Sequence, residues 1–176
     1  MARIPYFDFS QASPALAQTM QGRRPLKMYG LIGHADESAI SFLGLGRSLL
    51  AASSIDAGLR ELVILRTAAL CGANYEVVQH RKAAARIGLA AQKVDAVVVG
   101  IDTPMRIDAF DEKECAVLQF TDAVVREVKA PQAVFERVAA VLTHRQIVEL
   151  LMIIGFYMMA SRIGETLEID LEEDAP

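Results

Sequence analysis

The sequence predicts an all-α protein, and three observations support that prediction. Aromatic residues make up only 6% of the 176 residues and Trp is absent. Ala, Leu and Met are frequent, which is typical of close helix packing rather than of sheets. Signals for helix starts and ends also recur along the whole chain. A hydrophobic content of 53% in a chain of this length indicates one domain, residues 1–176, with its own core.

Capping residues divide the first half of the chain into short helices. Ser13 before Pro14 is typical of a helix start, and Asp56 can cap another, because both side chains accept hydrogen bonds from free N–H groups. Glycines indicate three interruptions or ends, at Gly22, Gly72 and Gly88. The expected helices cover residues 14–21, 27–34, 36–52, 57–71, 73–87 and 89–99. Three consecutive valines leave a strand as the alternative for the last segment.

The second half contains further start signals. Asp111 with Glu114 has the spacing of a capping box. Thr143 with Gln146 has the same spacing, and Pro131 suits the first turn of a helix. Helices are therefore expected to begin at all three places.

The segment after Thr143 is apolar on nearly every side. Residues 147–159 contain Ile, Val, Leu, Met, Phe and Tyr with almost no polar face. A helix of this kind must be buried all round, and a domain of 176 residues can hardly cover it alone. We therefore expect a homo-oligomer.

Charge and composition exclude several classes of partner. The net charge is -4 and the pI is near 5.4. The only short basic run, formed by Arg23, Arg24 and Lys27, is too small for a nucleic-acid surface. The first ten residues lack the apolar core of a secretory signal. The uncharged stretch Leu150–Ala160 is shorter than the roughly 20 residues of a membrane span. The sequence predicts a cytoplasmic protein without nucleic-acid or membrane partners.

Cysteine usage predicts neither disulfides nor a metal. Cys71 and Cys115 stand 44 positions apart, and no Cys/His pair has the spacing of a zinc site. Residues 1–24 are expected to form an N-terminal extension with a short helix. Residues 168–176 are expected to be a solvated acidic tail.

The segment 60–80 contains the residues best suited to chemistry. Glu76 and His80 are four positions apart, so they share one helix face. A carboxylate beside an imidazole fixes its tautomer and favours its protonated form, which suits proton transfer near neutral pH. Glu76 would also lie in the first turn after Gly72, where the helix dipole favours its ionised form.

Plainer interpretations of these residues remain open. A Glu/His pair at this spacing is also common on helix surfaces, and Glu61 between two arginines can be an ordinary ion-paired residue. Tyr75 can point its hydroxyl into a pocket or serve as a packing anchor. Cys71 suits a small buried apolar position better than a reactive thiol.

The run 60–88 reads R-E-L-x-I-L-R, then G-A-x-Y-E-x-x-x-H, then A-x-x-x-G-L. From about Pro25 to its end the chain resembles the carboxymuconolactone decarboxylase and alkylhydroperoxidase D-like family, with further support from I-V-E-L at 147–150 followed by Gly155 and Tyr157. The resemblance implies a compact all-α fold that assembles as trimers or hexamers.

The resemblance also separates two activities. In the hydroperoxidase branch a C-x-x-C pair cycles between dithiol and disulfide, but this chain has Ala73 and Glu76 at those positions. Cys71 lies two residues earlier, which rotates it about 200° away on a helix. The decarboxylase branch resembles E-x-x-x-H here, which Glu76 and His80 match. The resemblance makes Glu61 a candidate for the second carboxylate.

The function expected from the resemblance is a decarboxylase-like enzyme without a cofactor or metal. Glu61, Glu76 and His80 would be catalytic, and Tyr75 would bind substrate. His80 would donate the proton, Glu76 would orient His80 and favour its charged form, and Glu61 would complete the proton relay. The substrate would be a small carboxylated or lactone-like acid. The alternatives are an alkylhydroperoxidase-like, peroxiredoxin-type oxidoreductase and a non-catalytic oligomeric binding protein.

Overall fold

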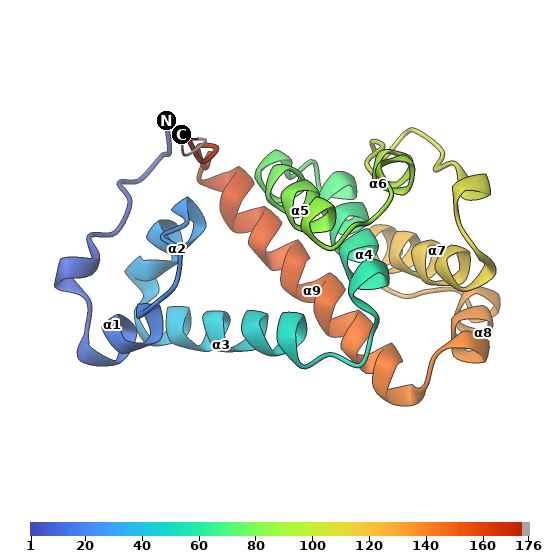
Figure 1. Ribbon diagram of the computed structural model, residues 1–176, viewed down its shortest axis with the longest axis horizontal. Coiled ribbons are helices and arrows are strands. Elements are labelled where there is room, and N and C mark those ends of the chain that lie inside the picture. The colour runs from blue at the N-terminus through green and yellow to red at the C-terminus, as the bar shows by residue number, and fades with distance from the viewer. Residues whose placement is uncertain (174–176) are drawn as a thin grey trace.

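The protein, described by a computed structural model over residues 1–173, is all-α, as predicted. This part of the chain contains nine α-helices, three short 3-10 turns and no strand (Figure 1). The α-helices are α1 Pro14–Met20, α2 Lys27–Ile32, α3 Glu37–Ala51, α4 Ala57–Leu70, α5 Asn74–Arg86, α6 Ala91–Val97, α7 Glu112–Glu127, α8 Gln132–Val141 and α9 His144–Thr166. The 3-10 turns are Phe9–Gln11, Gly33–Ala35 and Ile107–Ala109.

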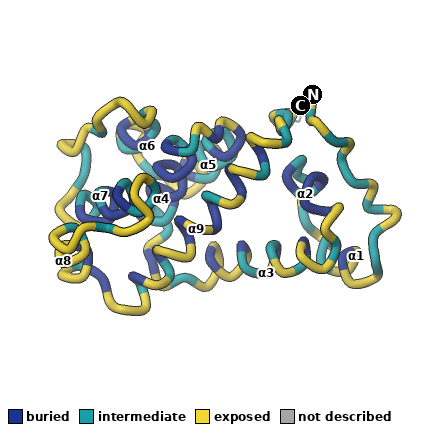
Figure 2. The backbone as a smooth tube through the Cα atoms, turned by 180° about the vertical axis from the view of Figure 1, so that it is seen from behind, coloured by how far each residue is buried: buried dark blue, intermediate teal, exposed yellow. Residues whose placement is uncertain are grey.

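Helices α4 and α9 form the centre of the fold. Helix α4 packs against α5, α7 and α9, and ten of its 14 residues are buried, so it has no solvent face (Figure 2). Among them Leu62, Val63, Ile64 and Leu65 have no exposed surface. Helix α3 meets α9 at an angle on the other side, and α1 and α2 complete an N-terminal arm (Figure 1).

Helix α9 is buried on one face and apolar on the other. Leu150, Ile153 and Ile154 are completely buried, whereas Leu151 and Met152 on the opposite face are exposed. With 23 residues, α9 is longer than the uncharged stretch within it, and by length and composition alone it could cross a membrane. Half of its most apolar window is buried inside the protein, a pattern shared by core helices.

The predicted helix starts are confirmed where a side-chain cap was expected. Ser13 accepts from the Leu16 N–H, and Asp56 accepts from the N–H groups of Gly58 and Leu59. Both capping boxes, Asp111/Glu114 and Thr143/Gln146, are present. Pro131 stands one position earlier than expected, as the N-cap of α8. The strand alternative near the valines is wrong, because α6 runs through Val97.

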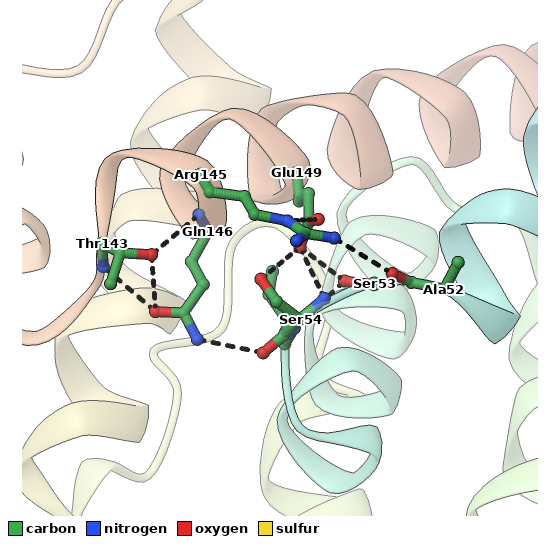
Figure 3. A network of polar contacts seen from close by, with 8 residues as sticks. Ala52, Ser53, Ser54, Thr143, Arg145, Gln146 and Glu149 are labelled. Carbon is green, nitrogen blue, oxygen red and sulfur yellow. Dashed lines mark hydrogen bonds and ion pairs between the residues drawn. The ribbon is translucent and has the colours of Figure 1, made fainter.

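A polar network ties the start of α9 to the loop before α4 (Figure 3). Glu149 accepts hydrogen bonds from the backbone N–H and hydroxyl of Ser54, from Ser53 and from Arg145. Partial burial alone would raise the pKa of Glu149, but these donors outweigh it and lower the pKa to about 2. Glu149 is therefore ionised in the folded protein, and it joins the start of α9 to the loop between α3 and α4.

The described part of the acidic tail is not free in solvent, contrary to expectation. Asp170 accepts from the Tyr6 hydroxyl at 2.9 Å and pairs with the N-terminal amine. Glu172 accepts from the Lys27 backbone N–H at 2.7 Å. The N-terminal residues and residues 170–172 therefore lie together beside α2 (Figure 1). Residues 174–176 of the expected tail lie outside the described residues.

Candidate active site

A cavity of about 410 Å³ lies between the N-terminal arm and the central helices. Helix α3 can approach α9 closely here because residue 46 is glycine: a Cβ on Gly46 would lie only 2.8 Å from Cζ of Phe156. Apolar side chains from α2, α3 and α9 form the walls, among them Met28, Phe42 and Leu43. The structure brings all four predicted site residues to this cavity: Glu61, Tyr75, Glu76 and His80.

His80 is held between two carboxylates at the buried end of the cavity. Its Nδ1 lies 2.7 Å from Oε2 of Glu61, and its Nε2 lies 3.7 Å from Oε2 of Glu76. Glu61 comes from α4, 19 positions earlier in the chain, and both carboxylate side chains are less than 10% exposed. The closer partner of His80 is thus Glu61, whereas the helical spacing indicated Glu76. With Glu61 ionised, the Nδ1–H donates to it, and Nε2 is left toward Glu76.

Glu76 is not held in its ionised form in the way the helix dipole suggested. Desolvation by burial raises its pKa, and the favourable charge of His80 offsets only part of that effect. The loss of solvation destabilises the ionised carboxylate more than the helix dipole at the first turn of α5 stabilises it. Glu76 therefore takes up a proton more readily than an exposed glutamate, and it can exchange a proton with Nε2 of His80.

Tyr157 closes the site on the side of α9. Its ring meets the His80 ring edge to face, with the centroids 4.8 Å apart and the planes at 89°. Burial raises the pKa of Tyr157 well above its ordinary value, and the charges of Glu76 and Glu61 raise it further. The phenol stays neutral, and its ring fixes the orientation of the imidazole.

Tyr75 lines the cavity with its ring, but its hydroxyl is engaged elsewhere. The hydroxyl donates to Oε1 of Glu172 at 2.6 Å, so it does not point freely toward a ligand. Burial raises the pKa of Tyr75, and the hydrogen bond with Glu172 raises it further. Tyr75 therefore forms part of the wall and connects the cavity to the C-terminal segment.

Both cysteines lie away from the Glu/His cluster. Cys71 lines a different cavity, beside Ser161 and Arg162, and burial raises the pKa of its thiol despite that arginine. Burial and nearby acidic groups also raise the pKa of Cys115. Both groups are therefore neutral thiols and poor nucleophiles near neutral pH.

The other two histidines lie outside the site. His34 Nε2 contacts the Pro5 carbonyl at 2.8 Å, and His144 is the first residue of α9. Over residues 1–173 no group of three or more His, Cys, Asp or Glu side chains is arranged to hold a metal ion.

Sequence reasoning missed several cavity residues that the structure adds. Gln79 and Arg86 share the face of α5 that carries Glu76 and His80, as their helical spacing could have indicated. Arg47 of α3 faces the same cavity, and no local signal could have paired it with α5. These residues change the charge of the cavity from acidic at its buried end to basic at its opening.

Residues 37–123, close to half of the chain, match the profile of the carboxymuconolactone decarboxylase family. The matched segment contains Glu61, Glu76 and His80. This segment of the chain belongs to the carboxymuconolactone decarboxylase family. A comparison with curated protein sequences found no significant match.

Solved structures confirm the alkylhydroperoxidase D-like fold of this family. The apo debrominase Bmp8 is 19% identical with a TM-score of 0.79, and the alignment covers 96% of this chain and 91% of that one. A peroxidase-related protein from Silicibacter sp. is 17% identical, with a TM-score of 0.77 and coverage of 97% and 93%. A putative antioxidant defence protein AhpD from Agrobacterium tumefaciens is 22% identical, with a TM-score of 0.71 and coverage of 81% and 96%. At these identities the likeness establishes the fold.

Proposed function

We propose that this protein is a decarboxylase-like enzyme that transfers a proton at His80 to a small carboxylated or lactone-like acid, without a cofactor. The observation that carries the proposal is the His80 ring, bound by Glu61 at 2.7 Å and facing Glu76 at 3.7 Å, at the buried end of an apolar cavity. An imidazole fixed in this way is suited to general acid and base catalysis near neutral pH.

The proposed reaction breaks one carbon–carbon bond and forms one carbon–hydrogen bond. The bond to the carboxylate breaks, CO2 leaves, and its electron pair moves through a conjugated system onto a carbonyl oxygen as an enolate. The proton on His80 Nε2 then passes to carbon, and the carbonyl re-forms. Glu61 stabilises the imidazolium during the cycle, as an oriented carboxylate does beside a catalytic histidine. Glu76, with its raised pKa, returns a proton to Nε2 and is itself reprotonated from water.

The test is the decarboxylation of a panel of small unsaturated and lactone acids in D2O. CO2 release measures the reaction, and NMR detects the deuterium that is incorporated at carbon. We expect His80→Ala to lower turnover by roughly 10²–10⁴-fold. The matched control is His34→Ala, because His34 does not line the cavity and its ring contacts Pro5 and Phe7. A His80→Ala variant with unchanged turnover would contradict the proposal.

A peroxidase-type oxidoreductase is the alternative, favoured by the names of two structural neighbours, a peroxidase-related protein and a putative antioxidant defence protein. A thiol cycle would have to use Cys71 or Cys115, which stand far apart in the sequence and have raised thiol pKa values. Thiol titration before and after peroxide tests this alternative. Loss of free thiols coupled to peroxide turnover would favour it over the decarboxylase.

A third possibility is a non-catalytic binding protein that uses the same cavity. This possibility would be favoured if the wild-type protein bound a ligand in the cavity without converting it and turned over no acid in the panel. The debrominase Bmp8 has been crystallised with tribromopyrrole, so this fold can accept a small aromatic molecule.

The surface of α9 supports assembly into a homo-oligomer. Four apolar side chains on this helix are exposed: Val148, Leu151, Met152 and Met159. A contiguous apolar helix face in a folded protein is typical of a subunit interface. A second copy of the chain is the expected partner, in a trimer or hexamer.

A further inference from the structure

Three arginines line the cavity that contains His80. Arg23 from the loop before α2, Arg47 from α3 and Arg86 from α5 all line it. Arg23 donates from Nε to the Thr19 carbonyl. Within residues 1–173, the side chains of Arg47 and Arg86 form neither a hydrogen bond nor an ion pair, and both residues are exposed. Because both side chains are exposed and line the cavity, these two unpaired guanidinium groups mark its solvent-facing end.

Helix α5 arranges this charge difference along the depth of the cavity. Glu76, Gln79, Ala83 and Arg86 recur at helical spacing on one face, and all of them line the cavity. Glu76 and Arg86 are ten residues apart, about 15 Å along the helix axis. Side chains on a helix tilt toward its N-terminus, so Arg86 leans back over the cavity.

Gln79 supplies a further hydrogen-bond donor between the two ends. Its Nε2 is buried and has no hydrogen-bond partner within the described residues. A buried donor without a partner is costly, and a rotation of the amide into the cavity would let an acceptor oxygen on a bound molecule satisfy it. This face of α5 therefore carries the Glu76 carboxylate at the buried end of the cavity, the Gln79 amide above it and the Arg86 guanidinium at the opening.

These charges orient an anionic ligand in one direction only. An anion placed at the buried end would meet Glu61 and Glu76, whereas at the opening it meets Arg47 and Arg86. Between the two ends the walls are apolar, with Phe42, Leu43 and Phe156 among their residues. The best-matched occupant has a flat apolar body and keeps an anionic group near solvent.

We propose that Arg47 and Arg86 form an anion-recognition subsite for a carboxylate of the substrate that does not react. The substrate class is thus an amphipathic acid whose conjugated part reaches His80 while a separate carboxylate stays at the opening; this assignment rests on the proposed function of the same cavity. The departing carboxylate is a different group, because arginines gripping it would stabilise the ground state and slow its loss as CO2.

Binding of two matched probes, trans-cinnamate and trans-cinnamamide, tests the subsite by isothermal titration calorimetry. The two molecules share one apolar body and differ in charge. Wild-type protein should bind cinnamate about tenfold more tightly, as expected for charge-assisted hydrogen bonds at a partly solvated site. Arg47→Gln combined with Arg86→Gln should abolish that preference and leave cinnamamide binding unchanged. Arg137→Gln is the matched control, because Arg137 is an exposed arginine on α8 away from the cavity.

Three results would overturn the subsite: a cinnamate preference that survives in the double variant, an equal loss of cinnamamide binding, or no cinnamate binding by the wild-type protein at millimolar concentration. The assay needs no turnover, so it is separate from the test of the proposed function. His80→Ala should retain the cinnamate preference even if no acid in the panel is ever decarboxylated.

Discussion

The ion pair of Arg66 and Asp122 should be the most sensitive polar contact in the core. The Arg66 side chain is only 1% exposed, and it binds Asp122 through two hydrogen bonds of 2.6 and 2.7 Å. Its Nη1 also donates to the carbonyls of Val97 and Val99, at 3.3 and 2.9 Å. Arg66 thus joins α4 to α7 and to the end of α6. Asp122→Asn keeps the size of the side chain but leaves the guanidinium charge buried without a counterion.

Removing one partner of a buried ion pair costs about 3–5 kcal/mol. The lower end of that range applies here, since the Asp122 side chain is 25% exposed and water can reach it. For a protein of this length each kcal/mol moves the Tm by about 2–4 °C, so a loss of about 3 kcal/mol should lower it by about 6–12 °C. The effect is large compared with a total stability of about 5–15 kcal/mol.

Thermal and urea unfolding followed by circular dichroism measure this loss, and Asp95→Asn provides the control. Asp95 pairs with Arg81 at 2.8 Å, but the Asp95 side chain is 63% exposed and the Arg81 side chain is 40% exposed. An exposed pair of this kind contributes about 0–1 kcal/mol, so the control should shift the Tm by a few degrees at most. Equal shifts in the two variants would refute the argument that burial of the Arg66 charge decides the cost.

Three further predictions concern the thiols, the acid range and the assembly. Replacing Cys71 and Cys115 by Ala should leave turnover largely intact, because neither lines the cavity of His80; loss of peroxide-dependent turnover in folded Cys71→Ala would reverse the order of the two enzyme functions. Glu149→Gln should remove about 1–2 kcal/mol of stability at neutral pH, after allowance for solvent screening. The folded pKa of Glu149 is about 2 and its ordinary value is 4.5, so the extra stability of the wild-type protein should be complete above pH 4.5 and decrease as the pH falls toward 2. Urea unfolding of both proteins across that range measures the difference, and a difference that stays constant would contradict the prediction. Sedimentation at micromolar concentration should find a trimer or larger closed assembly, and a monomer of 19.2 kDa would contradict the proposed interface on α9.

The helix starts could be predicted because they depend on contacts within three or four residues. Ser13 caps the N–H of Leu16, and Thr143 pairs reciprocally with Gln146. Such contacts form whenever the local chain turns into a helix, whatever the rest of the protein does. The all-α fold and the shared face of Glu76 and His80 follow from the same local periodicity.

Local rules failed where burial decided the outcome. The first turn of α5 indicated an ionised Glu76, but packing against α9 and α4 desolvates this carboxylate and raises its pKa. The acidic composition of the tail indicated free solvation, yet Glu172 caps the start of α2 and accepts from Tyr75. The pKa of Glu76 and the contacts of Glu172 both depend on which helices pack against these side chains, and residue spacing along the chain does not specify that packing.

By itself the sequence determined the helices, their caps and the family motif that contains Glu61, Glu76 and His80. The tertiary structure alone decided that Glu61 is the close partner of His80, because the crossing of α4 and α5 sets that 2.7 Å contact between residues 19 positions apart. It also brought Arg47 of α3 to the same cavity as Arg86 of α5. Helical periodicity specifies which side chains share a face, whereas only the packing of whole helices specifies which faces meet.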